Sequence, residues 1–160
     1  MLWGVVGQCG RPFQRSPVNG FLGSYQHQID DKGRLSLPAP FRREGGDEPM
    51  VLVHAFPDAL TLYPQRTWAE VEARLREMLR LNPQARAYVL KVTANAVEVV
   101  PDRQGRIMVP ARLQESVGIA GPALIVGAID RIELWNPERF QAATAEPVAE
   151  AERFTHQIFG

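Results

Sequence analysis

The chain has 160 residues, and its 45% hydrophobic and 22% charged content is typical of a soluble globular protein with one domain or two small halves sharing a core. Its 18 basic and 18 acidic residues balance, so net charge by itself indicates no nucleic-acid partner. The single Cys9 excludes an intrachain disulfide, and no apolar run reaches the roughly 18 residues of a membrane helix. We therefore expect a cytoplasmic protein with no membrane partner.

The first half of the chain predicts a unit of strand, turn, strand, short helix and hairpin. Tyr25, His27 and Ile29 alternate along the first strand, Asp and Gly residues favour the turn, and two prolines fit only a first helical turn. The segments are strand 23–29, turn 30–33, strand 34–37, helix 38–44 ended by Gly45-Gly46, and hairpin strands 51–56 and 60–63.

Two helices are predicted before the unit recurs. Apolar residues at three- and four-residue steps indicate a helix over about 64–81 with one apolar face, and a second helix over 84–93 follows the break at Asn82-Pro83. That face consists of Trp68, Val71, Leu75, Met78 and Leu79. The later segments are strand 97–100, turn 102–105, strand 106–109, a helix from 110 stopped by Gly118, strands 123–126 and 131–135, and a last helix capped by Asn136.

The chain contains an internal repeat. Residues 30–39 and 102–111 share the pattern D-x-x-G-R-[LI]-x-[LV]-P-A at an offset of 72 positions, and apolar residues of the two hairpins coincide at the same offset. Two copies are too few for a solenoid, which generally needs about three. We therefore expect an α+β fold in which two pseudo-symmetric β-rich halves interlock, with helices packed on them.

The predicted organisation has four parts. Residues 1–20 lack periodicity and are expected to form a disordered extension. Residues 21–82 form the first half with its connecting helix, and residues 83–142 form the second half. Residues 143–160, interrupted by Pro147, are expected to form a mobile C-terminal tail.

For catalysis the sequence offers no recognisable constellation. It lacks the G-x-S-x-G, H-E-x-x-H and G-x-x-x-x-G-K-[ST] motifs, and His27, His54 and His156 have neither ligand nor triad spacing. The adjacent Asp30 and Asp31 are not reproduced as a pair in the second copy. We therefore predict no enzyme, no catalytic residues, no metal site, no cofactor and no small-molecule substrate.

The repeated turn places an arginine at the same position twice. In D-x-x-G-R the glycine permits a tight turn, and the aspartate four residues before the arginine is placed to accept its guanidinium. An oriented arginine suits two-pronged contact with guanine O6 and N7, and Arg34 and Arg106 would supply two such forks. The alternative is that both arginines form structural ion pairs only. Candidates for phosphate contacts are Lys32, Arg42, Arg43, Arg103 and Arg112.

From residue 21 to about residue 140 the chain resembles the MraZ family of bacterial transcriptional regulators, relatives of AbrB-type swapped-hairpin proteins. The start at 21–25 resembles the family's usual beginning, and the two D-x-x-G-R segments resemble its D-x-x-x-R motifs. The resemblance implies a swapped-hairpin barrel and a ring-like homo-oligomer larger than a dimer. It also implies a nucleoid-associated protein that binds tandem G-rich boxes in double-stranded DNA and regulates a division and cell-wall gene cluster.

We assign DNA-binding roles to six residues, and the resemblance supports those of Arg34 and Arg106. Arg34 and Arg106 are expected to read guanines, Asp30 and Asp102 to orient them, and Lys32 and Arg103 to hold phosphates. The first copy has Asp31 where the second has Arg103, so the two turns are expected to be electrostatically unequal. Residues 1–20 precede the family's usual start and are expected to be dispensable, with Val18 a candidate start residue.

A second class of function stays open. The same scaffold would serve as a protein-interaction module, as antitoxins on related folds do. Phe154, Ile158 and Phe159 in the C-terminal tail are a modest set of anchors for such a partner.

Overall fold

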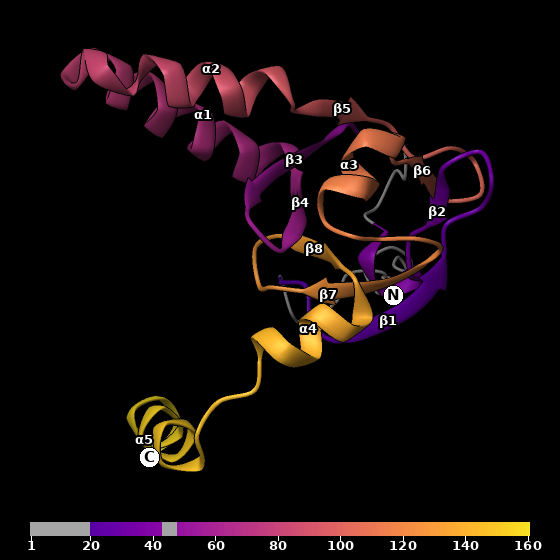
Figure 1. The fold of residues 1–160 in the computed structure, drawn as a ribbon, viewed down its shortest axis with the longest axis vertical. Helices are drawn as coiled ribbons and strands as arrows, with labels where there is room; N and C mark the ends of the chain where they lie inside the picture. Colours follow the sequence, from indigo (N-terminus) through magenta and orange to yellow (C-terminus); the bar gives the residue numbers. More distant parts are fainter. Residues whose placement is uncertain (1–19, 43–47) are drawn as a thin grey trace, which may run out of the picture.

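The computed structural model describes residues 20–42 and 48–160, and Figure 1 shows their arrangement. The predictions for residues 1–19, for Arg43 and for the helix end at Gly45-Gly46 lie outside the described residues. The strands are β1 (Ser24–Gln28), β2 (Arg34–Ser36), β3 (Met50–Phe56), β4 (Ala59–Pro64), β5 (Val97–Val99), β6 (Arg106–Met108), β7 (Pro122–Gly127) and β8 (Ile132–Trp135). The α-helices are α1 (Gln65–Leu81), α2 (Arg86–Ala94), α3 (Ala111–Ser116), α4 (Pro137–Ala143) and α5 (Val148–Phe159), and short 3-10 helices are η3 (Ala39–Phe41) and η4 (Pro83–Ala85).

The strands confirm the repeat and show how its copies meet. Six of them form an antiparallel sheet in the order β1-β7-β8-β4-β3-β5, and β2 pairs with β6 in a separate two-stranded ribbon. Strands β1, β2, β3 and β4 of the first copy correspond to β5, β6, β7 and β8 of the second. Replacing each strand of the sheet by its counterpart gives the same order reversed, so the order is palindromic. The edge strand of each half therefore pairs with a strand of the other half: β1 pairs with β7, and β5 pairs with β3.

The fold class is α+β, as the sequence predicts, but the structure does not confirm the predicted swapped-hairpin barrel. Among the described residues, β1 and β5 are the two edges of the large sheet, so its pairings do not close into a barrel. Residues at equivalent positions of the two copies fill a single core. These buried pairs are Leu35 and Ile107, Leu37 and Val109, Phe41 and Leu113, Leu60 and Ile132, and Leu62 and Leu134.

The helix pair α1–α2 packs on the sheet only at its near end. Near the sheet, Trp68, Val71 and Leu75 are half-buried, but Met78 and Leu79 further along are 46% and 37% exposed. A helix of 17 residues is about 25 Å long. The far end of the pair therefore extends past the sheet, as Figure 1 shows.

The C-terminal helices follow the second hairpin. Asn136 caps α4 by accepting hydrogen bonds from the backbone N–H groups of Glu138 and Arg139, at 2.8 and 3.1 Å. Residues 144–147 then lead to α5, which stands apart from the sheet in Figure 1. Pro147 lies at the start of this helix, where a proline is tolerated. The mobility of the tail stays a prediction.

Candidate nucleic-acid interface

The ribbon β2–β6 brings the two repeated motifs side by side. Arg34 lies opposite Met108, Leu35 opposite Ile107, and Ser36 opposite Arg106. Opposed residues of an antiparallel pair share a face, and faces alternate along each strand. Leu35 and Ile107 are therefore the inward pair and are fully buried. The outward face presents one arginine from each half of the chain.

The first turn is built around the carboxylate of Asp30. The backbone carbonyl of Asp30 accepts the N–H of Gly33 at 3.0 Å, and Gly33 has φ +85°, a backbone angle that favours glycine. Asp30 Oδ1 accepts the N–H groups of Lys32 and Arg34, at 2.9 and 2.8 Å. Asp30 Oδ2 accepts the guanidinium Nε of Arg34 at 2.7 Å. One carboxylate therefore fixes both the turn and its arginine.

The second turn reproduces this geometry. Gly105 has φ +78°, and its N–H donates to the carbonyl of Asp102 at 2.9 Å. Asp102 Oδ1 accepts the N–H groups of Gln104 and Arg106, both at 2.9 Å, and Oδ2 accepts Arg106 Nε at 2.8 Å. The predicted contact between each aspartate and the arginine four residues later is therefore confirmed in both copies.

Each arginine uses only Nε in this contact. Within the described part of the chain, the terminal nitrogens of Arg34 and Arg106 make no hydrogen bond, and their side chains are 32% and 29% exposed. An Nε held in place leaves the outer edge of the guanidinium free and oriented. The ribbon can therefore offer two pre-positioned donor forks to a ligand.

The electrostatics of the two aspartates follow from the same contacts. The backbone N–H of Arg34 is the main cause that lowers the pKa of the Asp30 carboxyl, and the Arg34 side chain lowers it further. Arg106 lowers the pKa of Asp102 in the same way. Hydrogen bonds to the charged form of a carboxyl favour that form, so both aspartates stay ionised at neutral pH.

Each turn is also held by the opposite half of the chain. The N–H of Leu37 donates to the carbonyl of Gly105 at 2.9 Å, and the N–H of Val109 donates to the carbonyl of Gly33 at 2.8 Å. These two contacts are related by the repeat offset. The two turns therefore cannot be displaced independently of the ribbon.

A side-chain brace that the sequence analysis missed lies beneath each turn. Arg42 Nε donates to the carbonyl of Leu37 at 2.9 Å, and at the equivalent place Gln114 Nε2 donates to the carbonyl of Val109 at 2.8 Å. The sequence contains a signal for this brace, because residues 42 and 114 are separated by the repeat offset of 72. The contacts that the two side chains make depend on how the two halves pair, which the repeat offset alone does not predict.

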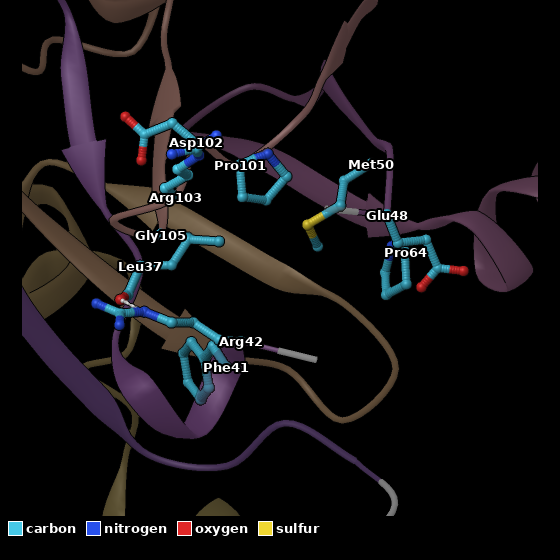
Figure 2. A pocket seen from close by; sticks show the side chains of 10 residues that line it. All are labelled: Leu37, Phe41, Arg42, Glu48, Met50, Pro64, Pro101, Asp102, Arg103 and Gly105. Carbon is cyan, nitrogen blue, oxygen red and sulfur yellow. Dashed lines mark hydrogen bonds between the residues drawn. The ribbon is translucent and has the colours of Figure 1, made fainter. Parts of the chain in front are cut away.

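Arg42 also lies against the second turn, and Figure 2 shows it beside Gly105 and Leu37. A Cβ at Gly105 would collide with the Arg42 guanidinium group. The same group borders a cavity of about 100 Å³ between this turn and η3. The cavity is lined by Leu37, Phe41, Arg42, Glu48, Met50, Pro64, Pro101, Asp102, Arg103 and Gly105.

A family model described as "MraZ protein, putative antitoxin-like" matches residues 21–91 and, separately, residues 92–157. The chain belongs to the MraZ family. A transcriptional regulator MraZ from Desulforamulus reducens is 36% identical over 138 residues, which are 86% of this chain and 96% of the relative. One from Thermomicrobium roseum is 41% identical over 129 residues, 81% of this chain and 89% of the relative. The two family matches correspond to the two copies of the repeat.

The six predicted site residues of this MraZ-family chain lie together at the two turns. Lys32 and Arg103 are exposed, and neither side chain makes a hydrogen bond in the part of the chain that is described. Arg112, a candidate from the sequence, instead donates to Asn95 at 3.0 Å. Lys32 and Arg103 therefore remain the freer cations beside the ribbon.

The histidines take structural positions in this MraZ-family fold. His27 Nδ1 lies 2.7 Å from the carbonyl oxygen of Ser36 and His54 Nε2 lies 3.3 Å from that of Pro57. Among residues 20–42 and 48–160, no group of three metal-ligating side chains is gathered. No helix in the same ranges has the length and apolar content needed to cross a bilayer.

Proposed function

We propose that this chain is a sequence-specific DNA-binding transcriptional regulator that reads guanines with the β2–β6 ribbon. The observation that carries the proposal is the pair of arginines on one face of the ribbon, each fixed through Nε by an aspartate and open at its outer edge. Relatives matching most of the chain are named transcriptional regulators, which supports the same function.

The shape of the ribbon suits the major groove of DNA. That groove is about 12 Å wide and admits a two-stranded β-ribbon, and an arginine fork matches guanine O6 and N7. Arg34 and Arg106 would read bases, while Lys32 and Arg103 at the two exposed turns would contact phosphates. Asp30 and Asp102 are positioning residues, because they bond the arginines and carry the wrong charge for a phosphate.

The proposal includes assembly. Two arginines give few base contacts, so specific affinity requires several copies on adjacent G-rich boxes, which favours a ring-like homo-oligomer larger than a dimer. The exchange of β1 and β5 between the halves supports the swapped-hairpin arrangement of the family. The proposed targets are the division and cell-wall gene cluster, including the protein's own gene, and the proposed location is the nucleoid in the cytoplasm.

The test pairs DNA binding with stability. Arg34→Ala and Arg106→Ala should each cost about 1–3 kcal/mol of binding to a tandem G-box operator and relax discrimination against a scrambled sequence. Arg34→Lys should also fail, since an ammonium cannot make the two-pronged contact. The matched control is Arg139→Ala, which removes one exposed charge from α4.

Thermal unfolding of the same variants separates the two roles of the arginines. If Arg34→Ala and Arg106→Ala retain full discrimination between operator and scrambled DNA and only lower the melting temperature, the arginines are turn braces and the base-reading role is wrong. A protein-interaction module on the same scaffold would show that outcome.

A further inference from the structure

Helix α5 presents an apolar side to solvent. At 100° per residue, Val148, Phe154, Ile158 and Phe159 fall within an arc of about 140° on one side of the helix, and Gln157 lies outside that arc. These four side chains are 73%, 43%, 72% and 82% exposed. A helix with one apolar face in water is unusual for a monomer and indicates an interaction surface.

A second apolar surface lies at the far end of the α1–α2 pair. Its members belong to both helices and extend beyond the sheet in Figure 1. They are Met78 (46% exposed), Leu79 (37%), Leu81 (66%), Tyr88 (55%) and Leu90 (48%). Tyr88 and Leu90 flank the buried Val89, so α2 turns apolar side chains both inward and outward.

The two surfaces carry opposite charge. Residues 65–94 contain six basic and three acidic side chains, a net charge of +3, whereas residues 146–159 contain three acidic and one basic, a net charge of −2. Opposite potentials steer two surfaces together and fix their orientation. The segments that carry the two apolar surfaces therefore have net charges of opposite sign.

We propose that α5 of one copy docks its apolar side on the α1–α2 end of a second copy. The occupant is a second copy because Figure 1 shows the two surfaces apart within one chain, on separate projections from the sheet. The contact joins two different surfaces, so it is head-to-tail, and repetition of such a contact closes a ring or extends a filament. This inference rests on the assembly in the proposed function and names its interface.

The docking leaves the DNA-binding face free. In Figure 1 the β2–β6 ribbon lies on the side of the molecule away from α5 and from the far end of α1–α2. Copies joined through their helices would therefore keep every ribbon exposed, and several ribbons would act on neighbouring boxes as one multivalent binder.

The first test is the mass of the full chain in solution. Ile158→Asp places a charge in the apolar side of α5, and Gln157→Asp adds the same charge outside that side. Light scattering should show the mass of the Ile158→Asp protein falling toward that of one chain, while the Gln157→Asp protein keeps the native mass. Leu79→Asp should reproduce the loss from the other surface. A native mass for Ile158→Asp, or a wild-type protein that is already monomeric, overturns the proposal.

The second test locates the contact. In a Cys9→Ser background, an Ile158→Cys chain is co-expressed with a larger, tagged Leu79→Cys chain and treated with a short bismaleimide. A crosslinked species joining the two chains is expected, and Gln157→Cys in place of Ile158→Cys should give far less of it. A chain carrying both cysteines that crosslinks only within itself would show docking in the same molecule and overturn the proposal.

The outcomes keep this inference separate from the proposed function. Ile158→Asp should weaken binding to tandem boxes by about 10²-fold or more while a single box is bound as before. If Ile158→Asp changes neither mass nor affinity but Arg34→Ala abolishes discrimination, the helix contact is wrong and base reading stands. If Ile158→Asp lowers the mass and Arg34→Ala retains discrimination, the helix contact stands and base reading is wrong.

Discussion

The two D-x-x-G-R turns share a backbone and differ in charge. Their aspartate-centred hydrogen bonds have nearly the same lengths, and each is tied to the other half through a glycine carbonyl. The charged side chains of the first turn cancel, whereas the second turn has two arginines to one aspartate and Arg42 beneath it adds a third. The repeat therefore preserves the geometry of the turn while its charge differs between the two copies. The second turn is therefore expected to contribute more to phosphate contact.

The largest effect is expected from the glycines that give both turns their shape. Gly33→Ala and Gly105→Ala force a side chain into the left-handed region and should each destabilise the fold by about 1–2 kcal/mol. A Cβ at Gly33 also lies 3.0 Å from the Val109 carbonyl oxygen, which is backbone, while at Gly105 it meets the flexible side chain of Arg42. Urea unfolding should therefore show the larger loss for Gly33→Ala. Equal stability of both variants and wild type would contradict the shared geometry.

An exchange of charges between the turns should produce an intermediate effect, this time on DNA. Asp31→Arg gives the first turn the residue found at the equivalent position of the second and raises its net charge by two, and Arg103→Asp lowers the net charge of the second turn by two. Each phosphate contact contributes about 0.9 to the slope of log affinity against log salt. On scrambled DNA, the slope should steepen by about 0.9 for Asp31→Arg and flatten by about the same amount for Arg103→Asp. Slopes that do not move would show that the turns do not touch phosphate.

The smallest effect is expected from acid titration of the two aspartates. Hydrogen bonds from Arg34 and Arg106 lower the carboxyl pKa values of Asp30 and Asp102 in the folded state. A lowered pKa contributes stability above the unfolded value of about 3.9, and that stability is lost as pH falls through the folded value. The difference in melting temperature between wild type and Asp102→Asn should therefore be present at pH 6 and shrink below about pH 4. A difference that stays the same below about pH 4 would contradict the role of the ionised carboxylate.

Local features of this chain could be predicted from the sequence, and pairings between the halves could not. The D-x-x-G-R turns, the strand order within each copy and the Asn136 cap follow from neighbouring residues. The placement of β1 beside β7, the brace from Arg42 and the exposed far end of α1 depend on contacts between distant segments. The three- and four-residue spacing of apolar residues in α1 is the same whether its apolar side meets a sheet, a second copy or water. Sequence periodicity therefore identifies an apolar face but not its partner.

The pairing of β1 with a strand of the opposite half has a consequence for the synthesis of this protein. Ser24 pairs with Val126, so the first strand leaves the ribosome long before its partner exists. At roughly 5–20 residues per second the wait lasts about 5–20 seconds. During that time β1 lacks its partner β7 and β4 lacks its partner β8, so another nascent copy can pair with their open edges. Crowded translation of one messenger would therefore favour strand exchange between neighbouring chains, and a slower ribosome would lengthen the period of risk.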